Sequence, residues 1–289
     1  MGSIQARVEA ALARLLPAPD IVPQRLHQAM RYAVLGGGKR VRPLLAFAAG
    51  DLAGAEPARV EFVACAVECV HAYSLVHDDL PCMDDDVLRR GKPTCHVEYD
   101  EATALLVGDS LQAFAFQLLS EQRLADDPAA QVEMLRILAS ACGSRGMAGG
   151  QAIDLDSIGK SLTLPELEHM HIHKTGALIR ASVALGARCG PSLSAKELEH
   201  LVRYSKFIGL AFQVVDDILD CEASTATLGK TAGKDAAANK PTYVSVLGTA
   251  QARSLAEELR SAAQQAIAGF GARAQRLAAL ADFIVLREF

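Results

Sequence analysis

Apolar residues recur at three- and four-residue spacing along most of this 289-residue chain, which is the spacing of an α-helix. The stretches with this pattern are 4–16, 24–35, 58–77, 101–121, 130–146, 176–188, 195–219, 241–247 and 250–268. Segments with glycine or proline separate them, and no stretch shows the apolar–polar alternation of a half-buried strand. No linker-like segment divides the chain. We therefore expect one all-α domain over residues 1–289, built as a helical bundle.

Two further positions have the pattern of a capping box, which marks the first turn of a helix. They are Thr163 with Glu166 and Ser194 with Glu197. We expect a helix to begin at each.

Composition excludes several classes of partner. The net charge is −5 at pH 7, so the chain lacks the basic excess of a nucleic-acid-binding protein. The seven cysteines are scattered and form no C-x-x-C pair, which favours reduced thiols and a cytoplasmic location. The first helix has charges within its apolar stretch, unlike a signal peptide. No uninterrupted apolar run approaches the roughly 18 residues of a transmembrane segment, so we expect none.

The first acidic cluster places five aspartates between Asp78 and Asp86, directly after the apolar segment FVACAVECVHAYSLV. Pro81 should end or bend the helix, so that Asp84 can fold back towards Asp78 and Asp79. A run of acids by itself is usually a solvated loop. Here the preceding helix should be buried, and carboxylates gathered at an apolar cavity need a cation.

The second acidic cluster lies in another apolar segment, FIGLAFQVVDDILD. At 100° per residue, one face of this helix has four polar side chains: Gln213, Asp216, Asp217 and Asp220. Ligand sets made only of oxygen select hard cations, and Mg²⁺ typically binds through a few carboxylates plus substrate phosphates. The EF-hand pattern is absent. The two clusters therefore predict a magnesium site that faces a phosphorylated substrate.

Basic residues lie beside both clusters and could hold phosphate oxygens. The segment GGGKRVRP contains Lys39, Arg40 and Arg42, and Arg89 and Arg90 follow the first cluster. HKTGALIR contains Lys174 and Thr175, and LGKTAGKD…NKPTY contains Lys230, Lys234 and Lys240. A loop lysine alone says little, and Arg89–Arg90 could simply pair with the aspartates at the surface. It is their position beside both acidic motifs that is informative.

Two further features allow two interpretations each. His71 lies two turns before Asp78 and could donate to phosphate, although a lone histidine on an apolar helix is more often a core residue. In GMAGGQAIDL, Gln151 and Asp154 are one turn apart, after a glycine pair that permits close approach. Helix packing and ligand binding explain that segment equally well.

Seven motifs occur in a fixed order: GGGKRVRP, DDLPCMDD, RRGKPT, GMAGGQAIDL, HKTGALI, FQVVDDILD and LGKTAGKD…NKPTY. In this combination the chain resembles the all-helical trans-prenyltransferases. The resemblance implies a homodimer of helical bundles, each with a deep central cavity. It implies head-to-tail (1′-4) condensation of isopentenyl diphosphate with dimethylallyl or geranyl diphosphate, which gives farnesyl diphosphate and releases diphosphate.

The resemblance also assigns roles to residues. It makes two aspartate motifs the ligands of three Mg²⁺ ions, for which Mn²⁺ can substitute: Asp78, Asp79 and Asp84, and Asp216, Asp217 and Asp220. Asp85 is a possible extra member of the first motif. Four residues would hold the diphosphate of isopentenyl diphosphate: Lys39, Arg42, His71 and Arg90. The allylic site would comprise Arg89, Lys174, Lys230 and Lys240, with Thr175 and Gln213 beside them. The residues that would take part in catalysis are Asp78, Asp79, Asp84, Asp216, Asp217 and Lys174.

Product length depends, in this resemblance, on bulk below the first motif. Tyr73 is the fifth residue before Asp78, where an aromatic side chain would stop the product at fifteen carbons. On an ideal helix, however, Ser74 lies nearly under Asp78, whereas Tyr73 is rotated by about 140° from Asp78 around the helix axis. Tyr73 could therefore pack in the core instead of limiting the product. A geranyl or geranylgeranyl product stays open. The chain ends LREF, which leaves Arg287 as its only terminal cation.

Three other functions are compatible with parts of the sequence. A terpene cyclase also ionises prenyl diphosphates, but its second metal motif is mixed and it has no use for GGGKRVRP. A di-iron bundle could use the Glu-x-x-His pairs Glu68/His71, Glu168/His171 and Glu197/His200, but two further inward glutamates cannot be placed. A non-catalytic partner subunit usually lacks aspartates from one motif, whereas both are complete here.

Overall fold

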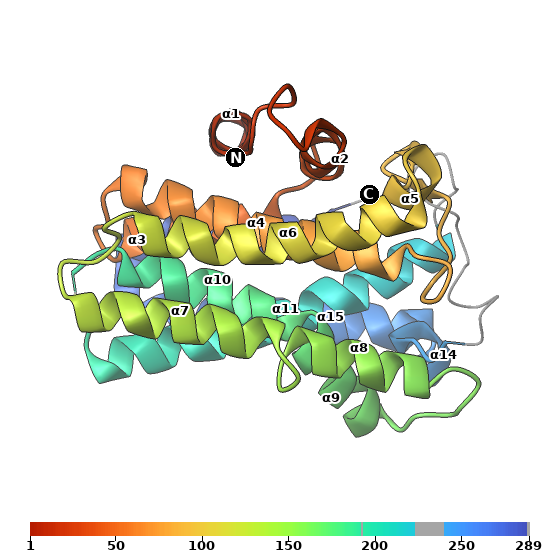
Figure 1. Ribbon diagram of the computed structural model, residues 1–289. Helices are drawn as coiled ribbons and strands as arrows, with labels where there is room; N and C mark the ends of the chain where they lie inside the picture. Colours follow the sequence, from red (N-terminus) through yellow and green to blue (C-terminus); the bar gives the residue numbers. More distant parts are fainter. Residues whose placement is uncertain (192, 223–239, 288–289) are drawn as a thin grey trace.

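The computed structural model describes residues 1–191, 193–222 and 240–287 as a bundle of α-helices (Figure 1). The helices of the N-terminal half are α1 (Gly2–Leu15), α2 (Gln24–Val34), α3 (Val41–Leu52), α4 (Pro57–Asp78), α5 (Cys95–Glu98), α6 (Glu101–Glu121) and α7 (Pro128–Cys142). They are followed by α8 (Met147–Asp156), α9 (Leu164–Lys174), α10 (Gly176–Arg188), α11 (Ala195–Glu222), α14 (Tyr243–Leu247), α15 (Thr249–Ile267) and α16 (Gln275–Leu286). A 3₁₀ segment, Ala268–Ala274, joins α15 to α16.

The long helices run along one another around two central helices, α4 and α10. Helix α4 packs against α3, α6 and α10, while α10 also packs against α3, α7 and α11. Helices α11 and α15 form a further close pair. In Figure 1, α6 and α7 lie in front of α10 and α11, and α1 and α2 lie across the top of the bundle. The ends of α4 and α11 that bear the acidic motifs are thereby held by tertiary packing.

Two helices, α4 and α6, are long and apolar enough to cross a membrane by length and composition alone. In α4, 72% of the apolar window is buried inside the bundle, which is typical of a core helix. In α6 only 44% is buried, and Leu105 and Leu106 are about half exposed. Helix α6 therefore exposes apolar side chains on the surface of this chain.

The predicted all-α class is confirmed, and most predicted helices agree with the structure to within a few residues. The continuous helix predicted over 130–146 is wrong: α7 ends at Cys142 and α8 begins at Met147. Gly143 and Gly146 lie between them, where the chain turns. The expectation of no strand is also corrected, because Leu88–Arg89 pairs antiparallel with Lys92–Pro93. Two-residue strands are too short for a detectable alternation.

Helix α3 was not predicted because nearly all of its residues are buried, so its sequence shows no polar face and no clear period. Helices α8 and α16 were also not predicted. Both predicted capping boxes are formed. Glu166 accepts from the backbone of Thr163 at the start of α9, and Glu197 accepts from Ser194 at the start of α11.

Candidate active site

The first acidic motif begins where α4 ends. Asp78 is the last residue of the helix, and after Pro81 the chain turns back, as predicted. The backbone N–H of Asp84 donates to the carbonyl of Asp78 at 2.8 Å, and that of Asp86 donates to Asp79 at 3.2 Å. This turn is what returns Asp84 to the first aspartate pair.

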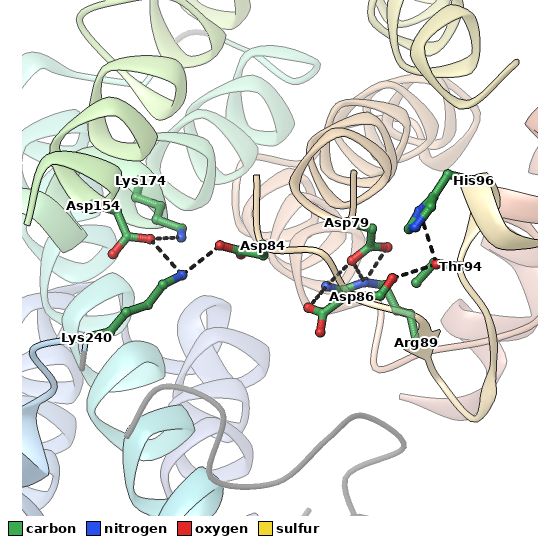
Figure 2. A network of polar contacts seen from close by, with 9 residues as sticks. All are labelled: Asp79, Asp84, Asp86, Arg89, Thr94, His96, Asp154, Lys174 and Lys240. Atoms are coloured by element: carbon green, nitrogen blue, oxygen red, sulfur yellow. Dashed lines mark hydrogen bonds and ion pairs between the residues drawn. The ribbon is translucent and has the colours of Figure 1, made fainter. Parts of the chain in front are cut away.

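Arg89 neutralises one member of this motif (Figure 2). Its Nε and Nη2 lie 2.8 and 2.6 Å from Oδ1 of Asp79, and Nη2 lies 3.4 Å from Asp86. Burial raises the pKa of Asp79, and the hydrogen bonds from Arg89 oppose that rise. Burial, with Asp84 and Asp79 nearby, raises the pKa of Asp78 to about 6, against the opposing charge of Lys174. For both aspartates, burial is thus the main cause of the raised pKa, and the neighbouring cations oppose it.

A second group of side chains joins this motif to α8, α9 and the segment before α14 (Figure 2). Lys240 Nζ lies 2.7 Å from Asp84 Oδ1 and 3.6 Å from Asp154 Oδ2. Lys174 Nζ lies 2.5 Å from the same Asp154 oxygen. Although burial acts to raise it, the pKa of Asp154 is lowered by Lys174 and Lys240. Asp154, whose role the sequence left open, holds the two lysines beside the first motif.

The glycine before Gln151 also has a defined role. A Cβ on Gly150 would lie 2.0 Å from the backbone nitrogen of Lys174 and 2.4 Å from its Cα. Only glycine lets α8 approach α9 this closely. Of the two interpretations of the glycine pair, close packing against another helix is therefore the one seen at Gly150. The amide atoms of Gln151 are buried and have no hydrogen-bond partner within the described part of the chain.

The second motif lies on the continuous helix α11. Asp217 is buried and accepts from Gln213 Nε2 at 2.9 Å and from the backbone N–H of Tyr243 at 2.8 Å. The hydroxyl of Thr175 donates to Gln213 Oε1 at 3.0 Å. Asp220 is also buried. The predicted allylic-site residues Thr175 and Gln213 therefore lead directly to the second acidic motif.

Asp216, the remaining member, contacts the C-terminal arginine. Nη2 of Arg287 lies 2.5 Å from Asp216 Oδ1, and the guanidinium stacks 4.3 Å from the centre of the Phe212 ring. The Arg287 side chain is only 3% exposed. The residue that follows the last helix thus brings a cation to the second motif, a contact that could not be predicted from the sequence.

A third group of residues is strongly electropositive. Arg42 is buried, which lowers its pKa; Glu68 and Asp216 oppose this shift, and Arg90 adds to it. Burial, followed by the charges of Arg42 and Arg90, lowers the pKa of His71 well below its ordinary value. Arg42 and Arg90 are therefore near enough to act on each other and on His71, and Arg90 Nη2 lies 3.9 Å from Glu68 Oε1.

The glycine-rich loop positions this group. Gly36, Gly37 and Gly38 all have positive φ, and a Cβ on Gly38 would lie 2.9 Å from the Arg90 guanidinium carbon. Arg90 Nη1 donates to the Gly37 carbonyl at 2.8 Å. Lys39, in the same loop, is half-buried.

Arg40 has a different role from its neighbours. Its guanidinium is buried and binds Glu68 at 2.5 Å, Glu9 at 2.6 Å and the Val34 carbonyl at 2.7 Å. It anchors the loop to α1 and α4. These contacts also remove Glu68 from the di-iron alternative, as Arg273 and the capping box do for Glu197.

The predicted chain-length residues lie inside the bundle. Tyr73 is buried in the main core and contacts His77 edge-on, with ring centroids 5.9 Å apart. Ser74 donates to the carbonyl of His71 at 2.9 Å. Lys230 lies outside the described residues, so its predicted contact is not placed.

Within the described ranges, no three carboxylate, imidazole or thiolate groups already converge as a metal site. The donor chemistry nevertheless fits Mg²⁺, because both motifs offer only carboxylate oxygens and Mg²⁺ commonly completes its shell with substrate phosphates and water. Cations now lie against members of both motifs: Arg89, Lys240 and Arg287. Both acidic motifs are thus paired with cationic side chains, which can also hold phosphate oxygens.

Comparison with known proteins agrees with this class. The family described as polyprenyl synthetase matches residues 23–272. A probable farnesyl diphosphate synthase of Bradyrhizobium diazoefficiens is 52% identical over 280 residues, 95% of this chain and 83% of that protein. The apo FPP/GFPP synthase of Zymomonas mobilis superposes with a TM-score of 0.88 at 40% identity, covering 98% of this chain and 96% of that one.

A third similar protein is a geranyltransferase of Helicobacter pylori, solved in complex with magnesium and isoprenyl diphosphate. It gives a TM-score of 0.87 at 33% identity, with 99% of this chain and 95% of that chain covered. The chain belongs to the polyprenyl synthetase family.

Proposed function

We propose that this protein condenses isopentenyl diphosphate head-to-tail with dimethylallyl and geranyl diphosphate, giving farnesyl diphosphate. The observation that carries the proposal is the junction of α9 and α10. Lys174 lies beside the first motif through Asp78 and Asp154, while its neighbour Thr175 leads through Gln213 to the second. One pair of adjacent residues therefore connects both acidic motifs, as a single diphosphate held between them requires.

The aspartates of both motifs would hold Mg²⁺, or Mn²⁺ in its place, and the number of ions is three by family resemblance. Bound there, the ions would neutralise the charge that develops on the departing diphosphate. Arg89, Lys174 and Lys240 add fixed positive charge on the same side. Arg42, Arg90, His71 and Lys39 would hold the second diphosphate, so that the double bond of isopentenyl diphosphate faces the allylic carbon.

The remaining steps depend on the cavity and on the released diphosphate. The apolar residues of α4 and α11 exclude water from the allylic cation that remains once diphosphate departs. The double bond attacks this cation, forming the new carbon–carbon bond, and the released diphosphate takes the proton from the adjacent carbon. The residues of this chain thus bind, orient and keep the site dry.

A substitution of the tyrosine before the first motif tests what sets the length of the product. Tyr73 is enclosed by core residues below Asp78, and Tyr73→Ala should open space there and give longer products. Chromatography of the radiolabelled product reports the length. A mixture identical to that of the unchanged protein would show that Tyr73 only packs the core, and Ser74→Phe then tests the alternative position.

A cytoplasmic homodimer is the proposed assembly, and α6 offers its interface. Leu105 and Leu106 are 50% and 54% exposed on a helix whose other side packs on α4. Burying such an apolar side against a second copy is favourable. Light scattering should give the mass of a dimer, and Leu105→Lys with Leu106→Lys should shift it towards the monomer.

The deciding experiment incubates the folded protein with labelled isopentenyl diphosphate, each allylic primer and Mg²⁺, and separates the products. Condensation to a C15 diphosphate is expected, with loss of most of the rate in Asp78→Ala and Asp216→Ala. No condensation with any primer would overturn the proposal. Iron-dependent absorbance with no condensation would favour the di-iron alternative.

A further inference from the structure

The hairpin after the first acidic motif carries two of the proposed diphosphate-binding residues, Arg89 and Arg90. It is formed by β1 (Leu88–Arg89) and β2 (Lys92–Pro93), and its ladder has two residue pairs. A two-stranded hairpin is at best marginally stable in water, so contacts outside the ladder must fix the direction of this one. Arg90 adds to that need, because its φ of 52° lies in the left-handed region, which a non-glycine residue keeps only where its surroundings hold it.

Thr94, the residue that follows β2, closes the base of this hairpin (Figure 2). Its backbone N–H donates to the Val87 carbonyl at 3.1 Å, and its hydroxyl donates to the Asp86 carbonyl at 2.6 Å. The residue is only 2% exposed, so water does not compete for the bond of the hydroxyl. Thr94 therefore joins the two ends of the segment 86–94, which contains both arginines.

Thr94 is also the N-cap residue of α5, where a threonine side chain usually accepts a hydrogen bond from the backbone of the next turn. That cap bond is not formed, because the hydroxyl faces Asp86 instead. Nδ1 of His96 lies 3.2 Å from the same hydroxyl oxygen, and it must be the donor because the hydroxyl proton is given to Asp86. The hydroxyl is therefore held in its direction towards the base of the hairpin.

Asp86 connects this contact to the first acidic motif. Its backbone N–H donates to the Asp79 carbonyl at 3.2 Å, and its carboxylate lies 3.4 Å from Nη2 of Arg89. Arg89 in turn binds the carboxylate of Asp79 through contacts of 2.6 and 2.8 Å. One residue, Asp86, thus links the hydroxyl of Thr94 to both members of the Arg89–Asp79 pair.

We propose that Thr94 is a positioning residue, whose hydroxyl holds Arg89 in place to bind the diphosphate of the allylic substrate. The inference rests on the proposed function for the identity of that substrate. Arg90 should depend on Thr94 less, because its Nη1 is also anchored on the glycine-rich loop, at the Gly37 carbonyl, at 2.8 Å. Loss of the hydroxyl should therefore weaken binding of the allylic substrate more than binding of isopentenyl diphosphate.

The test removes the hydroxyl and keeps the shape of the side chain. In Thr94→Val, KM for geranyl diphosphate should rise about tenfold, which is the effect of about one hydrogen bond. KM for isopentenyl diphosphate should rise less than about threefold, and kcat should stay within about threefold, because an interaction present in both ground and transition states affects KM. Thr94→Ser keeps the hydroxyl and should restore both KM values. Thr94→Ala removes the hydroxyl with less bulk and should reproduce the change seen in Thr94→Val.

Ser182→Ala is the matched control. Ser182 is also buried, and its hydroxyl also donates to a backbone carbonyl, that of Leu178, at 2.8 Å. This variant should lower Tm and leave both KM values unchanged, so a loss of stability alone is separated from a loss of positioning. In an Arg89→Met background, Thr94→Val should raise KM for geranyl diphosphate no further, because the residue through which it acts has been removed.

Amide hydrogen exchange across residues 86–94 provides a measurement that needs no turnover. Exchange should be faster in Thr94→Val than in the wild type, and unchanged in Thr94→Ser. An unchanged KM in Thr94→Val, an equal rise for both substrates, a full further rise in the Arg89→Met background or unchanged exchange would each overturn the inference while condensation by the wild type continues. A wild type that condenses no substrate would overturn the proposed function instead, and faster exchange in Thr94→Val would still support the role of Thr94 in holding the hairpin.

Discussion

The two acidic motifs are built in different ways. On α11, Asp216, Asp217 and Asp220 occupy one continuous helix, so the backbone period alone sets their spacing. The first motif is split: Asp78 ends α4, while Asp84 returns through a turn and is held by Lys240 from a segment 156 residues away in sequence. Where the helix is intact, the contact of Arg287 with Asp216 mainly adjusts charge. Where it is broken, outside contacts also fix position.

The largest expected effect is a loss of kcat that should be equally severe for a substitution in either motif. Asp78→Ala and Asp217→Ala should each lower kcat by about 10³-fold or more, since each removes several kcal/mol of charge stabilisation from the same departing diphosphate. Steady-state rates at saturating substrates and Mg²⁺ measure the loss. Asp126→Ala, an exposed acid paired with Arg59, is the control and should be neutral. A mild effect in one motif only would mean that the two do not share one site.

A smaller effect should distinguish the two motifs. Lys240→Met removes the cation that holds Asp84 and contacts Asp154, and should lower the rate about 10- to 100-fold with a higher Mg²⁺ requirement. Arg287→Met removes the equivalent cation from Asp216, whose position the helix already fixes. Its half-saturating Mg²⁺ concentration should change by only about twofold. Equal changes in the two variants would contradict the distinction between broken and continuous motifs.

The support of Asp217 can be separated from general stability with two tyrosines. Tyr243 and Tyr204 are both fully buried. The backbone of Tyr243 binds Asp217, and its ring stacks 5.4 Å from His171, one turn before Lys174. Tyr204 donates to the Leu277 carbonyl in a different core cluster. Changing either to leucine should cost roughly 1–3 kcal/mol of unfolding free energy.

Only Tyr243→Leu should also raise the half-saturating Mg²⁺ concentration, several-fold, because only that change frees the segment that holds Asp217. Tyr243→Phe keeps the stacked ring and should restore the wild-type value. Denaturant melts and Mg²⁺ titrations of the rate report the two quantities separately. If Tyr204→Leu shifted the Mg²⁺ requirement as far, the effect would be one of stability.

Much of this site could be predicted where chemistry follows local sequence. The helix that ends at Asp78, the turn after Pro81 and the common face of Asp216, Asp217 and Gln213 all follow from helix geometry and proline. The contacts of Asp154 and Arg287 could not be predicted, because they depend on how α8 and α16 pack on distant helices. Arg40 and Arg42, two residues apart, look equivalent in sequence. Only the fold places one on Glu68 and leaves the other in the electropositive group.

The smallest effect is expected at the N-terminal end of α11, the helix that contains the second acidic motif. Glu197 lies in the first turn of α11 and accepts from the Ser194 backbone at 2.9 Å and from Arg273 at 2.6 Å. These contacts, the Ser194 backbone hydrogen bond foremost, lower the pKa of Glu197 to about 2. Because the folded pKa lies below the unfolded one, this stabilisation is complete above about pH 4.5 and is lost as the pH falls towards 2.

Glu197→Gln should therefore lower Tm at pH 7 by a small amount, on the order of 1–2 °C, and the gap to wild type should narrow between pH 4.5 and 3. Calorimetry at several pH values measures it. The Mg²⁺ requirement should not change, because Asp216 lies about five helical turns away and the intervening helix is packed against α10 and α15. A shifted Mg²⁺ requirement would mean that even the continuous motif depends on contacts far from its ligands.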